Sequence, residues 1–203
     1  CEGVAMTLAN GAEHSDETFE GLALDEGDAL EEVRLEGCTV AGATLREVSL
    51  RRCLFDECTF ERCDLTMAKL FDSRLRGVRF VRCKLMGVDF TSAYGLGLEV
   101  SFEECVLSYA NFLGMDLSDT LFRGCRCEES IFDDANLRGA SFPESMLRGA
   151  RFGGADLRGA DFSEATAVAF DPRNAKLGKT KMSIEGAVVC ASLLGIEVLA
   201  LQS

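Results

Sequence analysis

Residues 135–164 read ANLRGASFPESMLRGARFGGADLRGADFSE, which is six groups of five with Leu or Phe third in every group. The spacing continues on both sides of this stretch. Counting in fives over residues 30–90 always reaches Leu, Phe or Val, and over residues 102–162 it reaches Leu, Phe and the single cysteine Cys127. The residue two places earlier is mostly Ala, Ser or Cys. A large and a small apolar side chain therefore recur together every five residues.

A period of five fits no ordinary element. A helix turns every 3.6 residues and a flat strand alternates every two, so either would scatter these side chains over all its faces. A chain that turns a corner every five residues would point all of them inward. Four corners close a square coil of twenty residues, and stacked coils form a solenoid with a continuous core. We therefore predict an all-β solenoid.

Two further patterns support four faces per coil. Phenylalanine recurs at twenty-residue intervals, so its rings should stack in ladders inside the tube at the ~4.8 Å spacing of neighbouring strands. The ladders expected are Phe102, Phe122, Phe142 and Phe162, then Phe112, Phe132 and Phe152, with Phe60 and Phe80 in the first run. Glycine falls two places after the central Leu or Phe, where a type II turn needs a positive φ. These glycines are Gly114, Gly124, Gly139, Gly149, Gly154 and Gly159.

The best copies are Ala-Asn-Leu-Arg-Gly at 135–139, Ala-Asp-Leu-Arg-Gly at 155–159 and Ala-Asp-Phe-Ser-Glu at 160–164. They resemble the repeat of the pentapeptide-repeat family, and the resemblance covers roughly residues 18–169. It implies a right-handed quadrilateral β-helix. With the count above, it divides the chain into a leader at 1–17, a β-helix at 18–169 and a C-terminal segment at 170–203.

The five-residue count slips twice. The phase changes by one residue near residues 24–30, and twelve residues instead of ten separate the two long runs at residues 91–101, TSAYGLGLEVS. Two extra residues must bulge there, so Tyr94, Leu96 and Leu98 are candidates for an exposed recognition loop. A tolerated insertion between two half-rods is the equal alternative.

The C-terminal segment changes character. Phe170-Asp171-Pro172 is expected to end the coil, because proline removes a hydrogen-bond donor. Ser183 can cap a helix that ends near Leu194, with Gly195 as its stop. So short a helix needs a packing partner. Its apolar stripe and the tail after it exceed what one coil end can cover, which predicts a twofold homodimer. The expected interface residues are Ile184, Ala187, Val188, Ala191, Leu194, Ile196 and Val198.

The ten cysteines do not indicate a disulfide framework. Seven occupy the small inward position and Cys127 takes a Leu position, so we interpret them as substitutes for alanine and leucine in a reducing compartment. Nothing completes a zinc tetrahedron around Cys125 and Cys127, and we expect no metal or other cofactor. No stretch has the length and apolarity of a membrane span and no signal peptide is evident, so we expect a cytoplasmic protein.

The charge is acidic and uneven. Residues 1–36 hold eleven acids against Arg34, a net of −10, whereas the other residues carry only −3 of the total of −13. This balance argues against a basic nucleic-acid binder. In the second run, acids flank the Phe102 ladder and the neighbouring Leu117 face. They are Glu103, Glu104, Glu144, Asp161 and Glu164, then Asp116, Asp119 and Asp156. They either keep the rod soluble or imitate the phosphates of DNA.

A finer resemblance joins these features. A pentapeptide rod closed by a helix and by Leu193-Leu194-Gly195-Ile196-Glu197-Val198 resembles the Qnr, MfpA, AlbG and McbG group, and residues 107–112 and 63–68 are similar to Qnr segments. The resemblance implies a dimeric, DNA-like protein that binds DNA gyrase or topoisomerase IV and protects it from topoisomerase poisons. The acids above, with Tyr94 and Leu96, would then contact the partner. A repeat scaffold with another partner is the alternative.

An enzyme is not expected. The one histidine, His14, lies in the leader, and no nucleophile motif or phosphate-binding glycine loop is present. Paired acids such as Asp133-Asp134 are expected on convex faces without a catalytic cleft.

Overall fold

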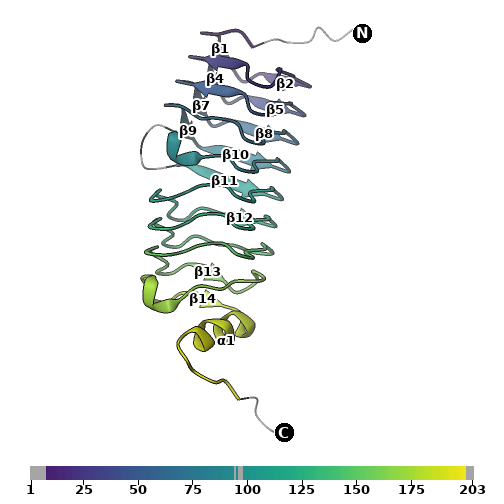
Figure 1. Cartoon of the computed structure of the whole chain (residues 1–203). Helices are drawn as coiled ribbons and strands as arrows, with labels where there is room; N and C mark the ends of the chain where they lie inside the picture. The colour runs from purple at the N-terminus through teal and green to yellow at the C-terminus, as the bar shows by residue number, and fades with distance from the viewer. Residues whose placement is uncertain (1–7, 94, 96–97, 200–203) are drawn as a thin grey trace.

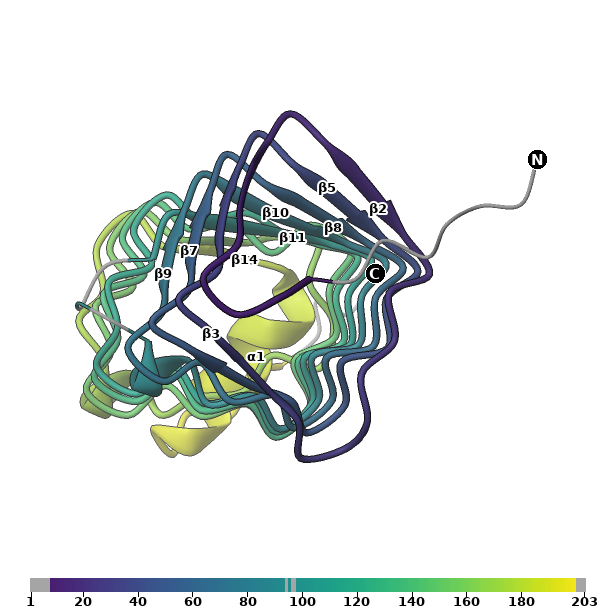
Figure 2. The ribbon, with the colours of Figure 1, turned by 90° about the horizontal axis from the view of Figure 1, so that it is seen from above.

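The protein is a straight rod of about eight stacked coils that ends in one short helix (Figure 1). The computed structural model describes residues 8–93, 95 and 98–199. Seen from above, successive coils share a four-sided outline, and each is displaced a little from the one before (Figure 2). All strand pairs are parallel. The predicted all-β solenoid is therefore confirmed.

Three sides of the square contain very short parallel strands, and isolated parallel bridges hold the fourth side. One sheet contains β1 (Glu13–Ser15), β4 (Arg34–Glu36), β7 (Leu54–Asp56) and β9 (Arg74–Arg76). The next contains β2 (Thr18–Glu20), β5 (Thr39–Ala41), β8 (Thr59–Glu61), β10 (Val78–Val81), β11 (Val100–Glu103) and β12 (Phe122–Arg123). Two further pairs are β3 (Ala29–Glu31) with β6 (Ser49–Arg51), and β13 (Asp161–Phe162) with β14 (Lys181–Met182). Isolated parallel bridges continue these ladders where a strand is too short to be assigned.

The register shows both slips in the repeat. Most partners are twenty residues apart, as in Phe55 beside Leu75. Phe19 instead pairs with Val40, twenty-one residues on, and Phe80 pairs with Phe102, twenty-two residues on. The extra residues are absorbed between the strands, so the inward positions stay aligned on either side of each slip.

The core is a column of side chains along the rod axis. Every large apolar residue counted in fives over 30–90 and 102–162 is buried. The rings of Phe102 and Phe122 stack at 5.1 Å, and those of Phe122 and Phe142 at 4.7 Å. The second ladder lies edge-on to the first, as the 85° between Phe112 and Phe122 shows. This edge-to-face contact between stacked columns favours one ring orientation throughout the tube.

The cysteines line this core. All nine in the described part of the chain are buried and free, so the seven at small inward positions and Cys127 at a Leu position lie in the core as expected, and Cys190 is buried in the terminal helix. Their thiols also donate to backbone carbonyls of the preceding coil, as from Cys58 Sγ to Leu35 O at 3.3 Å and from Cys83 Sγ to Phe60 O at 3.2 Å. Burial raises the pKa of the Cys58 thiol to about 11. The Cys58 thiol is therefore protonated near neutral pH and resists reaction.

The residues at the corners of the coils have left-handed backbone conformations, with a positive φ. The six glycines expected to have a positive φ all have one, between 61° and 77°. Seventeen other residues do as well, and ten of them are acids two places after an inward residue. These acids are Asp16, Glu32, Glu47, Glu57, Asp72, Glu104, Asp119, Glu129, Asp134 and Glu144. Steric cost at such positions is of order 1–2 kcal/mol for a side chain with a Cβ, and the stacked coils hold the corners in place nonetheless.

The insertion is folded more tightly than expected. A 3-10 turn, η1 (Phe90–Ser92), follows Asp89, whose carboxylate accepts from the Thr91 amide at 3.1 Å. Leu98 is only 6 % exposed, so its assignment to an outward loop was wrong. Its side chain takes the inward position that the five-residue count leaves without a large apolar residue between Phe90 and Phe102. Tyr94 and Leu96 lie outside the described residues.

The C-terminal end departs from the sequence-based expectation at Pro172. Parallel pairing continues beyond it, because Asp156 bridges to Lys176 and β13 pairs with β14. Pro172 instead opens a second 3-10 turn, η2 (Pro172–Asn174), that makes a corner. In the same way the first coil begins before residue 18, since β1 pairs with β4.

The helix α1 (Ile184–Leu193) closes the tube. The Ser183 hydroxyl accepts from the Gly186 amide at 3.1 Å, and Gly195 has a φ of 76°, as expected for the two helix ends. Gly186 and Cys190, one turn apart, form the buried face of the helix on the last coil. No helix in the described part of the chain is long and apolar enough to cross a bilayer.

Candidate partner-binding surfaces

The eight acids proposed for partner binding lie on two adjacent faces and their corners. Glu103 in β11 and Asp161 in β13 lie on the face of the Phe102 ladder. Asp116 and Asp156 lie on the preceding face, where bridges join each of them to Asn136. The rest occupy corners: Asp119 between these two faces, and Glu104, Glu144 and Glu164 on the far side of the Phe102 face.

Two of these acids are held by bases of the rod itself. Arg158 Nε lies 2.8 Å from Asp156 Oδ1, and Lys181 Nζ lies 2.9 Å from Asp161 Oδ2. Hydrogen bonds from Arg158 lower the pKa of Asp156 to about 2. The Ser163 hydroxyl, followed by Lys181, lowers the pKa of Asp161 to about 2. Both carboxylates are thus ionised but already paired.

The remaining acids are more available. Glu104 is exposed and forms only a 3.4 Å pair with the exposed Arg82. Among the described residues no ion pair involves Glu103, Glu144 or Glu164. The three corner acids Glu104, Glu144 and Glu164 follow one edge of the rod, so this edge carries the most accessible negative charge of the predicted set.

The density of this charge is well below that of DNA. The corner position between Glu104 and Glu144 is Gly124, so these carboxylates are two coils, or roughly 10 Å, apart. A DNA strand carries one charge per ~3.4 Å of axis. A partner that reads this edge must therefore combine charge with shape and apolar contact.

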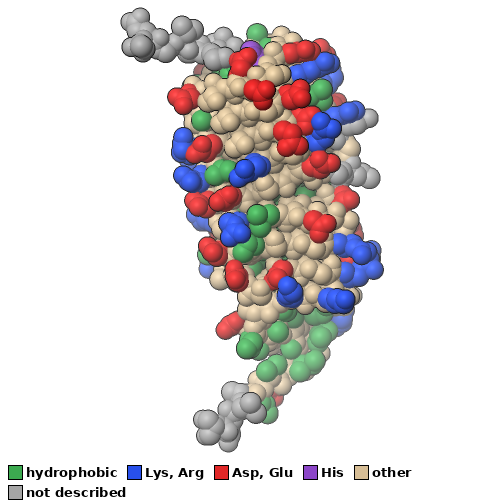
Figure 3. Space-filling model, turned by 180° about the vertical axis from the view of Figure 1, so that it is seen from behind, with side chains coloured by type: hydrophobic (Ala, Val, Ile, Leu, Met, Phe, Trp, Pro, Cys, Tyr) green, Lys and Arg blue, Asp and Glu red, His purple; other side chains and the backbone are tan. Residues whose placement is uncertain are grey.

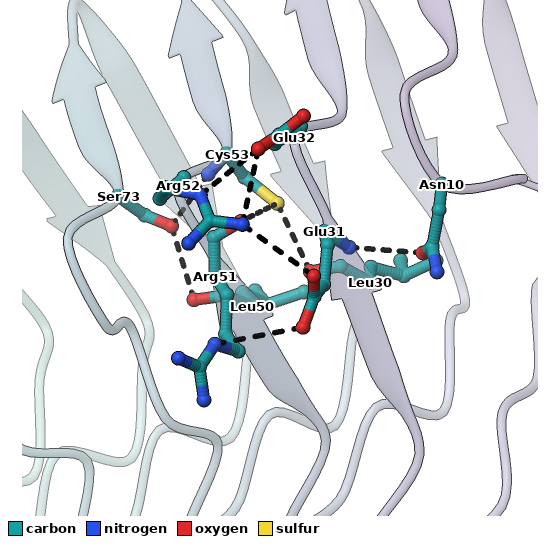
Figure 4. Close-up of polar contacts among 9 residues, drawn as sticks. All are labelled: Asn10, Leu30, Glu31, Glu32, Leu50, Arg51, Arg52, Cys53 and Ser73. Atoms are coloured by element: carbon teal, nitrogen blue, oxygen red, sulfur yellow. Dashed lines mark hydrogen bonds and ion pairs between the residues drawn. The ribbon is translucent and has the colours of Figure 1, made fainter.

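Some acids of the first coil pair with bases of the next coils. Glu31 lies 3.6 Å from Arg51 and 3.5 Å from Arg52, and Arg52 also reaches Glu32 at 3.0 Å (Figure 4). These residues are about twenty apart in sequence and become vertical neighbours in the stack. The strong charge asymmetry of the sequence is therefore reduced on the folded surface, although exposed pairs of this kind contribute little stability.

On the inner side of the same part of the rod, buried hydrogen bonds connect neighbouring coils. The Ser73 hydroxyl donates to Leu50 O at 3.0 Å and accepts from the Cys53 amide at 2.9 Å (Figure 4). No buried side-chain nitrogen or oxygen in the described residues lacks a partner. Within the same residues, no group of three or more His, Cys, Asp or Glu side chains is placed to hold a metal ion.

The face of the rod shown in Figure 3 carries acidic and basic side chains side by side along most of its length. Hydrophobic side chains gather at its lower end, below the last coils. The rod body therefore has a mixed surface, and its C-terminal end an apolar one.

Exposed large apolar residues of the described chain occur in only two places. The first set surrounds the middle of the rod and escaped the sequence analysis. It consists of Met67, Phe71, Met86, Tyr109 and Leu113. The sequence did contain a signal for this set, because these apolar residues take outward or corner positions of the five-residue count, where polar residues are usual.

Four members of this set frame one flat face. Alternate residues along a coil point outward, so Met67 and Phe71 lie on either side of Lys69, and Tyr109 and Leu113 on either side of Asn111 two coils below. Between them Asp89 accepts from Asn111 Nδ2 at 3.0 Å. Tyrosine, phenylalanine and methionine are enriched in the cores of protein interfaces.

The second set is the C-terminal end, where the dimer interface was expected. Ile184 is 82 % exposed, and Ala187, Leu194, Ile196 and Val198 are exposed as well. Val188 and Ala191 are half-buried. The helix therefore covers its own coil with Gly186 and Cys190 and leaves the predicted stripe accessible.

The sequence matches two family models. Residues 98–170 match the pentapeptide repeat region, and residues 30–66 match pentapeptide repeats in eight copies. Together they cover more than half of the chain. The comparison with curated protein sequences finds no significant match.

Solved structures share the fold along nearly the whole chain. One trypsin-treated variant of QnrB1, described as a plasmid-mediated fluoroquinolone resistance protein, is 20% identical with a TM-score of 0.69 and covers 95% of this chain and 99% of that chain. A second trypsin-treated QnrB1 variant is 23% identical with a TM-score of 0.56 and covers 96% and 98%. At these identities the likeness concerns the fold.

Proposed function

This chain is a member of the pentapeptide-repeat family, and on that premise we propose that it is a cytoplasmic, homodimeric, DNA-mimicking protein that protects a type II topoisomerase from poisons. The partner would be DNA gyrase or topoisomerase IV, bound without catalysis. The observation that carries the proposal is the match to the QnrB1 fold from the first coil to the terminal helix. Fluoroquinolone resistance is the role given for that protein.

The charge pattern supports the proposal in part. The edge of Glu104, Glu144 and Glu164 offers accessible carboxylates on a straight rod, and positively charged DNA-binding surfaces attract such an array over a Debye length of ~8 to 10 Å. Because this edge is less charged than DNA, the framed face of Met67, Phe71, Tyr109 and Leu113 would supply apolar contact. A rod that displaces DNA from a poisoned enzyme must also compete with substrate DNA, so rescue should turn into inhibition at high concentration.

A charge-reversal experiment tests this proposal. Glu104, Glu144 and Glu164 are changed together to Lys, and a matched control changes Asp16, Glu36 and Glu57 to Lys. These three exposed acids lie on the side of β4 and β7, away from the framed face, so both variants gain the same net charge at exposed positions. We expect the first variant to bind gyrase or topoisomerase IV at least tenfold more weakly and to lose rescue of a quinolone-stalled supercoiling reaction, with the control nearly unchanged.

Equal loss in both variants would indicate a general charge effect instead of a binding edge. No binding by the parent to either enzyme at low salt would contradict the proposed function.

The second candidate is a repeat scaffold with a different partner. The observation in its favour is the pairing of acids with bases of neighbouring coils, as in Glu31 with Arg51 and Asp161 with Lys181. Such pairing keeps a rod soluble without presenting a negative array. Capture of partners from a bacterial lysate separates the two functions, since only the first expects topoisomerase subunits.

A further inference from the structure

The framed face in the middle of the rod surrounds an unpaired cation. Lys69 is exposed on this face, and no ion pair among the residues that the structure describes involves it. Asp89 in the next coil is held by other groups, because one of its oxygens accepts from the Thr91 amide at 3.1 Å, the Thr91 hydroxyl at 2.6 Å and Asn111 Nδ2 at 3.0 Å. A protein that covered the face would therefore meet a free ammonium inside an apolar rim.

The apolar rim is held in place by the rod itself. Met67 and Tyr109 occupy the same left-handed corner two coils apart, with φ of 57° and 63°. Gly87 lies between them, and the thioether of Met67 fills the space that a Cβ at Gly87 would need. On the other side of the face, the Arg51 guanidinium lies 5.9 Å from the centroid of the Phe71 ring. Contacts within the rod thus order both sides of the rim, which lowers the entropy cost of binding.

The dimensions of the face fit an α-helix. Met67 and Phe71 are four residues apart on one coil, which is about 13 Å in extended chain, so a helix of about 10 Å diameter fits between the two sides of the rim. One helical turn rises about 5.4 Å and one coil about 4.8 Å, so successive turns would rest on successive coils. An extended strand is about half as wide as a helix and would reach only one side.

We propose that the framed face binds an α-helix of the partner protein, and that a carboxylate in the apolar stripe of this helix pairs with Lys69. The inference rests on the proposed function, which makes the partner a topoisomerase. A basic DNA-binding surface would repel this ammonium, so the helix lies outside the surface that the acidic edge would occupy. The edge of Glu104, Glu144 and Glu164 shares no corner with the framed face, because the Leu107 face lies between them.

A second copy of this chain is a poor source of the helix. The one α-helix among the described residues is α1, which carries Glu185. Its docking on the middle of another rod would be heterologous and would continue from rod to rod as an open filament. The framed face and the homodimer proposed at α1 are therefore separate surfaces.

Zero-length carbodiimide coupling tests the pair directly, because it joins an amine to a carboxylate in contact with it. The full chain is treated in complex with gyrase and, separately, with topoisomerase IV, and mass spectrometry identifies the linked peptides. We expect a link from Lys69 to an Asp or Glu in a helix of the enzyme. Lys69→Arg keeps the charge but cannot couple, so the link should disappear while the complex still forms.

Two further variants measure how much the contact contributes to affinity. Lys69→Glu should weaken binding about tenfold or more, whereas Lys176→Glu, an equal charge change at an exposed position of another face, should alter it little. Met67→Asn combined with Tyr109→Asn removes one side of the rim at corners where asparagine tolerates a positive φ, and should also weaken binding about tenfold. Thermal melts by circular dichroism establish that each variant is folded.

The outcomes separate this contact from the proposed function. A parent that binds the enzyme, with Lys69→Glu and the double Asn variant equally tight, would overturn the contact and leave the proposed function standing. Tighter binding by Lys69→Glu would show a basic surface at this position and overturn the contact as well. So would a link from Lys69 to Glu185 of a second copy, or to no carboxylate of the enzyme. A parent that binds neither enzyme would remove both proposals.

Discussion

The rings of Phe112 and Phe132 lie 5.1 Å apart and are parallel to within 3°. Phe152 continues the stack at 5.3 Å. Phe132 is fully buried, and the backbone of the neighbouring coils cannot move inward without breaking its own parallel hydrogen bonds. Phe132→Ala should therefore lower the free energy of unfolding by about 3 to 5 kcal/mol, as expected for a cavity that does not collapse. Urea unfolding measures it. Phe132→Leu, which keeps most of the volume, should cost about 1.5 kcal/mol or less.

The corner formed by Asp134 and Gly154 gives a second prediction. Gly154 has a φ of 73°, and the carboxylate of Asp134 occupies the space that a Cβ at Gly154 would need. Gly154→Ala should cost about 1 to 2 kcal/mol from the backbone, plus the displacement of this carboxylate. Combining it with Asp134→Gly should recover the second contribution only. Additive thermal melts for the two changes would show that the side chain is not in contact.

The buried thiols give a third prediction. Burial raises the pKa of Cys58 to about 11, and a hydrogen bond that the Cys83 thiol donates toward Cys105 is the main cause that raises the pKa of Cys83 to about 12. Iodoacetamide at pH 8 should therefore leave the nine described cysteines unmodified in the folded protein and alkylate them at the rate of unfolding. Mass spectrometry of the peptides checks this, with a denatured sample as control. Rapid modification of Cys83 in the native state would contradict the closed tube.

Ile184 tests the proposed homodimer. Its side chain is 82 % exposed at the first position of α1 and leaves the cap contact of Gly186 and Cys190 untouched. Ile184→Asp should therefore convert the dimer to a monomer, because it buries an unpaired charge at the interface, while the melting temperature of the rod stays within a few degrees. Light scattering and circular dichroism measure the two effects. Glu185→Gln, on the same turn, is the control and should remain dimeric.

The last strand pair should weaken in acid. The pKa of Asp161 is lowered to about 2 from its usual 3.8, mainly by the Ser163 hydroxyl and then by Lys181. A depressed carboxyl pKa contributes stability that is present above about pH 4 and is lost as the pH falls toward 2. After solvent screening we expect about 1 kcal/mol from this group. Asp161→Asn should flatten the stability curve of the rod between pH 4 and pH 2, and an unchanged slope would argue against the pair.

The candidate surfaces were only partly foreseeable. Ile184 and Leu194 could be named because a helical stripe shows its period over one short segment. The framed face could not, because Met67 and Tyr109 are forty-two residues apart and fall on the same corner of the rod, two coils apart, only when two coil repeats and the insertion are counted together. Leu98 was misplaced for the same reason. A break in the five-residue repeat shows that extra residues must be inserted between two coils. Only the packing of the folded chain decides which of them turns inward.

The sequence by itself determined the square solenoid, the inward residues and the phenylalanine ladders, because a five-residue period leaves one geometry in which every large apolar side chain is buried. Only the tertiary structure decided which charged side chains pair with each other. Glu31 meets Arg51 and Arg52, and Asp161 meets Lys181, only after the coils stack at strand spacing. It also decided that parallel pairing continues past Pro172. These outcomes depend on contacts between residues about twenty apart in the sequence. In a solenoid, the free energy of one coil is set by its contacts with the coils above and below it.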